Sequence, residues 1–133
     1  MKIKNRTIRP LGTLEEKVMN ILWRAGPFSV REVNQRLGEK SLAHTTVMTT
    51  LDRLFKKRLL FRTKEGNAYI YRYALSRDEY QQQLVASTVS GLMSKAANAS
   101  PVLAGFIDAA VEIDEENLTK LEALIAERRR SGG

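Results

Sequence analysis

The stretch from residue 43 to residue 57 constrains the fold most, because its apolar side chains recur at helical spacing. Val47, Leu51, Leu54 and Phe55 stand at i, i+4, i+7 and i+8, which predicts a helix with one buried face. At about 100° per residue, the opposite face carries hydroxyl groups at its N-terminal end and cations at its C-terminal end. The outward residues are Thr45, Thr49, Arg53 and Lys56, flanked by Thr46 and Asp52.

That outer face has two interpretations. Short side chains let a helix enter a groove of DNA, hydroxyl groups can bond to base edges or phosphates, and cations can neutralise phosphates. The face therefore fits a helix that reads DNA. The alternative is an ordinary solvent-facing helix, since threonine is common at exposed positions. This segment alone favours neither.

The distribution of charge favours nucleic acid. Residues 1–75 contain 16 Lys and Arg against 6 Asp and Glu, a net charge of +10, whereas residues 76–133 contain 6 against 9, a net charge of −3. A basic half joined to an acidic half suggests one surface for a polyanion and another for a different partner. Solubility alone would explain a net charge of +7 but not this asymmetry.

Length and composition exclude several classes of protein. A chain of 133 residues forms one domain, or one compact domain with an appended oligomerisation segment. The absence of cysteine excludes disulfides, thiolate metal sites and cysteine nucleophiles. No stretch approaches the roughly 20 apolar residues that span a bilayer, and the N-terminus does not resemble a signal peptide. We expect a soluble, cytoplasmic protein without membrane insertion.

Two helices are expected before the 43–57 segment. Each is opened by a capping box, in which a hydroxyl residue and a glutamate three positions later satisfy each other's backbone N–H groups. The two boxes are Thr13-x-x-Glu16 and Ser29-x-x-Glu32. Gly26-Pro27 ends the first helix and Gly38 ends the second. The short connection near residues 39–43 is typical of a helix-turn-helix.

After the third helix the pattern changes to that of strands. Residues 59–64 and 68–75 alternate around Glu65-Gly66-Asn67, which predicts a β-hairpin. We expect its tyrosines to complete the core, a role that the tip from Lys64 to Asn67 does not share. Cations on the hairpin are Arg62, Lys64 and Arg72. Three short helices followed by a basic hairpin form the winged-helix arrangement.

Three further helices are expected after residue 75. Ser76-x-x-Glu79 caps one that reaches about Ser94, Ser100 caps another with Pro101 at its first position, and Asp114–Glu116 begin the last.

The apolar surface of these three helices exceeds what the winged helix can cover, which marks a partner surface. We expect a second copy of the chain there, in a two-fold dimer. The residues expected at that surface are Leu92, Val102, Leu103, Phe106, Ile107, Leu118, Leu121 and Ile125. Packing on the chain's own N-terminal domain is the alternative.

An enzyme is the class of protein that the sequence supports least. His44 is the only histidine, and the chain has neither a cysteine to share a site with it nor a Gly-rich phosphate loop or nucleophile elbow. We interpret His44 as a helix-entry residue near a phosphate. No cofactor and no metal are expected.

Two stretches are similar to parts of a known family. Residues 11–23, LGTLEEKVMNILW, resemble its opening helix, and residues 45–57, TTVMTTLDRLFKK, resemble its recognition helix. The family is that of the penicillinase repressors (BlaI/MecI type), and the resemblance covers roughly residues 8–130. It implies a mainly α fold, with a winged-helix DNA-binding domain at residues 1–75 and a helical dimerisation region at residues 76–133. It also implies a homodimeric repressor that binds a dyad-symmetric operator in double-stranded DNA.

The resemblance further implies roles for individual residues. In the recognition helix, Thr45, Thr46, Met48 and Thr49 would face the major groove. Arg53, Lys56 and Lys57 would lie near phosphate, and the wing would bring Arg62, Lys64 and Asn67 to the backbone or minor groove. Apart from the resemblance, we also expect Arg9 and His44 to contact DNA. Met48 stands where some members have arginine, so it can offer only apolar contact, to a thymine methyl group.

Two regulatory devices of the family do not have their usual sequence signature here. Copper-responsive members carry a C-terminal Cys-x-Cys cluster, which a chain without cysteine lacks. Antibiotic-responsive members are inactivated by cleavage at an Asn-Phe bond, and the corresponding bond here is Gly105-Phe106. Cleavage there, with a membrane metalloprotease sensor as partner, is a hypothesis that rests on position. Two alternative functions stay open: a winged-helix protein-interaction module and a nonspecific architectural DNA binder.

Overall fold

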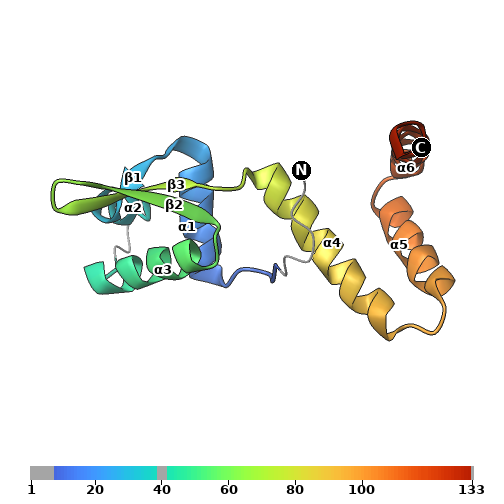
Figure 1. Ribbon diagram of the computed structural model, residues 1–133, viewed down its shortest axis with the longest axis horizontal. Coiled ribbons are helices and arrows are strands. Elements are labelled where there is room, and N and C mark those ends of the chain that lie inside the picture. Colours follow the sequence, from blue (N-terminus) through green and yellow to red (C-terminus); the bar gives the residue numbers. More distant parts are fainter. Residues whose placement is uncertain (1–7, 39–41, 133) are drawn as a thin grey trace. The chain divides into compact units, whose positions relative to one another are not determined.

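The structure, a computed structural model, describes residues 8–38 and 42–132. Along the chain the elements are α1 (Thr13–Ala25), β1 (Phe28–Ser29), α2 (Val30–Arg36), α3 (His44–Lys56), β2 (Leu60–Glu65), β3 (Ala68–Tyr73), α4 (Arg77–Lys95), α5 (Ala99–Ile113) and α6 (Glu116–Gly132) (Figure 1). The expected mainly helical fold with a β-hairpin wing is confirmed. The chain forms two compact units, of which the first ends at Ser87 and the second begins at Thr88.

Three antiparallel strands form the sheet of the first unit, in the order β1-β3-β2. The hairpin runs from the pair Leu60↔Tyr73 to the pair Glu65↔Ala68, so its loop has two residues. Gly66, the first of them, has φ 62°, a conformation that glycine adopts without steric cost. The sequence did not predict β1, which pairs Phe28 with Tyr71 and is two residues long.

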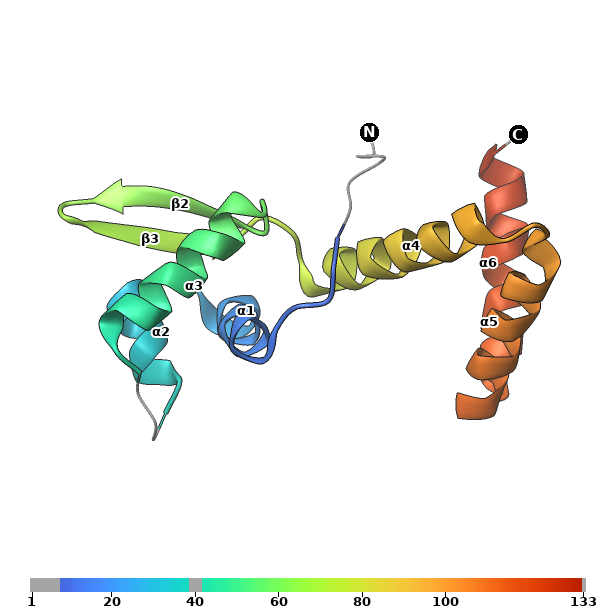
Figure 2. The ribbon, with the colours of Figure 1, turned by 90° about the horizontal axis from the view of Figure 1, so that it is seen from below.

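The core of the first unit is built mainly from the inward faces of three helices. On α3, the three aliphatic side chains Val47, Leu51 and Leu54 are fully buried, as their spacing predicts. They pack in one cluster with Val18, Met19 and Leu22 of α1, Val33 of α2, Leu60 of β2 and Tyr71 of β3. This packing orients α3 beside α1, α2 and β2 (Figure 2).

The hairpin tyrosines contribute less to this core than the sequence predicts. Tyr71 is 1% exposed, whereas Tyr69 is 39% and Tyr73 is 45% exposed. The expectation that all three tyrosines complete the core is therefore wrong. Side chains two residues apart lie on the same face of a strand, so all three tyrosines share one face of β3. Only Tyr71, between the other two, is buried in the core.

The capping boxes of α2 and α4 are confirmed. Ser29 Oγ accepts a hydrogen bond from Glu32 N at 3.2 Å while Ser29 N donates to Glu32 Oε1 at 2.8 Å. The same exchange joins Ser76 and Glu79 at 3.0 and 2.8 Å. Gly38 follows α2 with φ 90°, as expected of a glycine that ends a helix.

The caps predicted for α1 and α5 are wrong by one and two positions. Gly12 is the N-cap of α1, and its N–H donates to Glu15 Oε1 at 3.1 Å, so Thr13 already lies in the helix. Asn98 is the N-cap of α5, where its Oδ1 accepts from Ser100 N at 3.0 Å. In both helices the free backbone N–H bonds to a polar group that stands one or two residues before the one that the sequence pattern predicted.

Two connections fix the ends of α3. Asn34 of α2 donates from Nδ2 to Leu42 O at 2.7 Å and accepts from Leu42 N at 3.0 Å. Residues 39–41 of the expected connection lie outside the described residues. After α3, Arg58 has φ 68°, and Leu59 N donates to Leu54 O at 3.0 Å, which is a Schellman turn without glycine.

The first part of α4 belongs to the winged helix. Tyr80 is 7% exposed, its ring centre lies 5.6 Å from that of Trp23, and its hydroxyl donates to Arg9 O at 3.3 Å. Trp23 Nε1 donates to Leu75 O at 2.9 Å. These contacts join α4 to α1 and to the segment before α1. The division of function at residue 75 remains a prediction.

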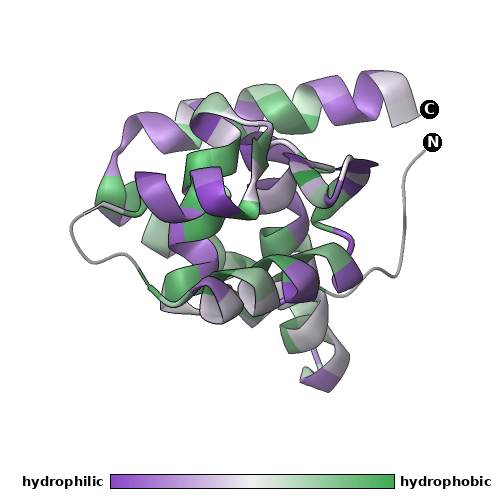
Figure 3. Ribbon diagram, turned by 90° about the vertical axis from the view of Figure 1, so that its left-hand side faces the viewer, coloured by the Kyte–Doolittle hydropathy of each residue, from purple (hydrophilic) through white to green (hydrophobic). Residues whose placement is uncertain are grey.

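In the second unit α5 and α6 lie side by side (Figure 2). Asn117 Nδ2 donates to Ala110 O at 2.9 Å, which ties their connection together. None of the described residues of α5 or α6 is buried. Exposed large apolar residues here are Leu92, Leu103, Phe106, Ile107, Ile113, Leu118, Leu124 and Ile125. Figure 3 shows hydrophobic segments along the last helix before its hydrophilic end.

Candidate nucleic-acid interface

The outer face of α3 is exposed over its whole length. Every residue that the sequence assigns to a contact with DNA on this helix lies there: His44, Thr45, Thr46, Met48, Thr49, Arg53, Lys56 and the C-cap Lys57. Met48 is 43% exposed, so the helix presents a large apolar side chain between the threonines. The face therefore combines hydroxyl groups, one apolar side chain and cations.

Thr50 is the one threonine of the helix that points inward. It is 6% exposed, and its Oγ1 donates to Thr46 O at 2.9 Å, one turn earlier. This bond satisfies a hydroxyl that would otherwise be buried without a partner. Sequence spacing alone did not identify it, because threonine occurs on either face of a helix.

An open hollow of about 610 Å³ lies between the start of α1 and the outer face of α3. Its wall combines backbone and carboxylate groups of α1 with the hydroxyls and cations of α3. The lining residues are Gly12, Leu14, Glu15, Thr45, Thr46, Thr49, Thr50, Arg53 and Lys57. The contribution of α1 was not predicted from the sequence, because Glu15 and Lys57 are 42 residues apart.

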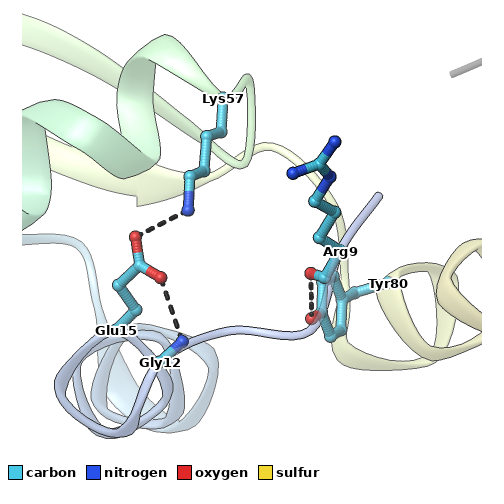
Figure 4. Close-up of polar contacts among 5 residues, drawn as sticks. All are labelled: Arg9, Gly12, Glu15, Lys57 and Tyr80. Atoms are coloured by element: carbon cyan, nitrogen blue, oxygen red, sulfur yellow. Dashed lines mark hydrogen bonds and ion pairs between the residues drawn. The ribbon is translucent and has the colours of Figure 1, made fainter. Parts of the chain in front are cut away.

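Lys57 is paired with Glu15 across this hollow (Figure 4). Lys57 Nζ lies 2.8 Å from Glu15 Oε2, while Glu15 Oε1 accepts from Gly12 N. Burial by itself raises the pKa of Glu15. The hydrogen bonds from Lys57 and Gly12, with the charges of Lys57 and Arg53, outweigh burial and lower this pKa below its usual value near 4.5.

Asp52 accepts from two cations at the C-terminal end of α3. Lys56 Nζ lies 3.0 Å from Oδ2, and Arg62 Nη1 lies 3.0 Å from Oδ1. The hydrogen bond from Lys56 and then that from Arg62 lower the pKa of Asp52 from its usual value near 3.8. The Lys56 side chain is 72% exposed and that of Arg62 is 23% exposed.

The wing places its three predicted residues differently. Lys64 and Asn67 are exposed near the tip of the hairpin, and Lys64 Nζ lies 5.9 Å from the centre of the Tyr69 ring. Arg62 instead turns toward α3, as its bond to Asp52 requires. The pKa of Arg62 is raised, chiefly by its hydrogen bond with Tyr71, against the effect of burial.

Arg9 lies before α1, close to the start of α4. Its carbonyl oxygen accepts a hydrogen bond from the Tyr80 hydroxyl. Its side chain is exposed and points away from that contact (Figure 4). Ile8 beside it is 7% exposed, with its N–H donating to Ser87 Oγ at 3.3 Å. The backbone at Arg9 is thus fixed while its guanidinium is available to a ligand.

In residues 8–38 and 42–132, no three His, Asp or Glu side chains lie close enough together to hold a metal ion. Over the same part of the chain, no helix has the length and apolar character needed to cross a membrane.

Comparison with known proteins identifies the family. Residues 11–127 match the sequence model of the family described as Penicillinase repressor. The chain is 33% identical over 125 residues to the Transcriptional regulator BlaI of Mycobacterium tuberculosis, covering 92% of this chain and 88% of that protein.

Two solved structures are also similar. The solution structure of the DNA-binding domain of the repressor BlaI is 28% identical and covers 56% of this chain and 93% of that one, with a TM-score of 0.49. The Bacillus licheniformis BlaI monomeric form in complex with the blaP half-operator is 26% identical, covering 55% and 94%, with a TM-score of 0.45. By the extent of the family match and its identity to the curated relative, the chain belongs to the penicillinase repressor family.

Proposed function

We propose that this chain is a homodimeric, sequence-specific transcriptional repressor that binds a dyad-symmetric operator in double-stranded DNA. One observation carries the proposal: α3 buries its aliphatic face completely and exposes an unbroken row of threonines, Met48 and cations. Its relative from Mycobacterium tuberculosis is named a transcriptional regulator, which agrees with this function. The function requires no catalytic residue and no cofactor.

In this proposal α3 lies in the major groove. Thr45, Thr46 and Thr49 hydrogen-bond to base edges or neighbouring phosphates, and Met48 contacts thymine methyl groups. Arg53, Lys56 and Lys57 neutralise phosphates at the end of the helix, with His44 at its start and Arg9 before α1. The ion pair of Lys56 with Asp52 does not prevent this, since an exposed ion pair contributes little net stability. The Lys57 side chain is 50% exposed beside Glu15, so it can also face a phosphate.

The wing tip extends this contact along the duplex. Lys64 and Asn67 approach the backbone or the minor groove from the end of the hairpin. The tight turn at Gly66 keeps both residues at the tip of the hairpin. Such contacts position the protein on DNA and carry little sequence information.

The second unit supplies the dimer. The exposed apolar residues of α4, α5 and α6 bury each other against a second copy, because a patch of this kind marks an interaction surface. The residues assigned to this interface are Leu92, Val102, Leu103, Phe106, Ile107, Leu118, Leu121 and Ile125. Two heads joined in this way read half-sites spaced by about one helical turn of DNA or a multiple of it. Repression follows from occupying promoter DNA that the polymerase needs.

Duplex selection tests the proposal. The full chain is mixed with a random-sequence duplex library, and bound duplexes are recovered and sequenced over several rounds. We expect an inverted repeat, bound about 10³-fold or more tightly than scrambled duplex at physiological salt. Binding to both duplexes with equal affinity would identify an architectural DNA binder. Absence of binding at low salt would favour the protein-interaction module.

Release from DNA by proteolysis is the regulatory part of the proposal. The bond Gly105-Phe106 lies within α5, and the Phe106 side chain is 44% exposed. A protease needs an extended substrate, so cleavage there requires α5 to unwind locally. Co-expression with the cognate membrane metalloprotease under inducing conditions should yield two fragments. An intact chain under those conditions would end this hypothesis.

A further inference from the structure

The Arg62 side chain connects the wing to the recognition helix. Its Nη1 donates to Asp52 Oδ1 at 3.0 Å, and its guanidinium carbon lies 3.9 Å from the centre of the Phe55 ring. The same carbon lies 4.3 Å from the centre of the Tyr69 ring. Asp52 and Phe55 belong to α3 and Tyr69 to β3, so a guanidinium from β2 contacts both other elements.

Lys56 provides an internal comparison, because it binds the other oxygen of the same carboxylate. Its ion pair has the same length of 3.0 Å, but its side chain is 72% exposed, against 23% for Arg62. Lys56 can therefore leave Asp52 for a phosphate and lose one exposed contact. Arg62 would lose a charge-assisted hydrogen bond and two ring contacts together.

We propose that Arg62 is a positioning residue, anchored by Asp52, that fixes the hairpin against α3 so that both meet DNA as one rigid surface. This inference rests on the proposed function and replaces the expectation that Arg62 itself contacts DNA. A planar guanidinium is required, because it can lie over aromatic rings while its edge donates to a carboxylate. A lysine at this position would retain the charge and lose the combined contact.

Substitutions of Arg62 separate positioning from contact with DNA. Arg62→Lys and Arg62→Gln are compared with Arg72→Gln, a matched control on β3 that is exposed and opposite Phe61, on the other face of the hairpin. Affinity is measured for the duplex that the wild-type chain selects, over a series of salt concentrations. We expect both Arg62 variants to bind about tenfold more weakly, the cost of roughly one base contact, with an unchanged salt dependence. The Arg72→Gln control should lose clearly less.

A phosphate contact by Arg62 gives a different result. In that case Arg62→Lys would keep most of the affinity, and Arg62→Gln would reduce the slope of log K against log salt by about 0.9. Either observation would overturn the proposal.

Asp52→Ala adds a test in which the direction of the change in affinity for DNA decides. Removing a negative charge beside DNA strengthens binding to every duplex if long-range charge alone acts. Loss of the anchor instead weakens binding to the selected duplex, and this is the expected result. Tighter binding of Asp52→Ala to that duplex would overturn the proposal.

A measurement without DNA keeps this proposal separable from the proposed function. Amide hydrogen exchange on the full chain should be faster in β2 and β3 of Arg62→Lys than in the wild type, and unchanged in Arg72→Gln. Unchanged exchange in Arg62→Lys would overturn the proposal whatever DNA the chain binds. Failure of the wild-type chain to select any duplex, with exchange altered as expected, would count against the proposed function alone.

Discussion

Glu15 accepts hydrogen bonds from two separate parts of the chain, the backbone N–H of Gly12 and the ammonium group of Lys57. The first bond caps α1 and the second holds the end of α3. Because these bonds together with the charges of Lys57 and Arg53 outweigh burial, the pKa of Glu15 is lowered. The carboxylate therefore stabilises the domain when it is ionised.

The first prediction concerns the pH dependence of this contribution. A group whose pKa is lowered by folding adds stability above its unfolded value, near 4.5, and this stability is lost as the pH falls through the folded pKa. Glu15→Gln keeps an acceptor for the cap and removes the charge. It should be less stable than the wild type by roughly 1 kcal/mol at pH 7, with the difference vanishing in acid. Urea unfolding at several pH values measures this. A difference that stays constant with pH would indicate lost packing instead.

The second prediction concerns the backbone at Arg58. An L-residue at φ 68° costs about 1 kcal/mol relative to glycine, so Arg58→Gly should raise the free energy of unfolding by about that amount. Arg58→Ala is the control, because it removes the charge and retains the strained backbone. Thermal unfolding of the three chains compares them. Equal stability of the glycine and alanine variants would contradict the prediction.

At the scale of elements, α3 was predictable because three aliphatic residues, Val47, Leu51 and Leu54, repeat at helical spacing and all three are buried. The N-terminus of α1 was not, since a glycine cap has no side chain to recognise and Thr13-x-x-Glu16 fits the pattern one residue too late. A two-residue strand such as β1 is too short to show alternation.

The orientation of the Arg62 side chain could not be predicted from the sequence either. Its place depends on the register that sets it opposite Tyr71 and on the approach of α3 to β2, both tertiary properties. The sequence could place a cation on the hairpin, but not decide whether it faces solvent or α3.

The third prediction distinguishes two kinds of DNA contact made by α3, one to bases and one to phosphates. Thr49→Ala should weaken binding to the selected duplex by about 1–3 kcal/mol and leave binding to random duplex nearly unchanged. Lys56→Ala should weaken both to a similar degree and reduce the salt slope by about 1. Fluorescence anisotropy with both duplexes at several salt concentrations measures these effects. Equal losses on both duplexes for Thr49→Ala would count against direct readout of bases.

The fourth prediction concerns the connection between α2 and α3. Asn34→Ala removes both hydrogen bonds to Leu42 and should lower the free energy of unfolding by about 1–2 kcal/mol. Asn34→Asp keeps the acceptor for Leu42 N but sets a carboxylate oxygen against Leu42 O in place of the donor, so at least half of the effect is expected. Urea unfolding ranks the three chains. An alanine variant as stable as the wild type would mean that Leu42 is held by other contacts.

At the scale of the whole molecule, the N-terminal and C-terminal parts of the chain differ both in net charge and in how far their side chains are buried. The basic residues are concentrated in the part that folds as the winged helix, with a net charge of +10 over residues 1–75. The second unit has two helices in which no described residue is buried. This division agrees with the proposed function, in which one unit binds a polyanion and the other an apolar partner.

The fifth prediction concerns self-association. Leu118→Asp should weaken the proposed dimer by about 2 kcal/mol for each copy, because it places a charge where the dimer would bury an exposed leucine. Ala123→Asp introduces the same charge about 140° around α6 and should leave association unchanged. Analytical ultracentrifugation over a range of concentrations distinguishes them. Identical sedimentation of Leu118→Asp and the wild type would exclude this face from the interface.

The exposed helices α5 and α6 also bear on how long the protein persists. In the proposed dimer, these helices would derive their stability from association, because none of their described residues is buried within one chain, and their folded fraction would fall as the chain is diluted. Dilute copies then populate open forms that cellular proteases degrade. We expect the half-life of the protein to shorten as its abundance declines, so that the last copies disappear fastest and genes under its control return abruptly to full expression.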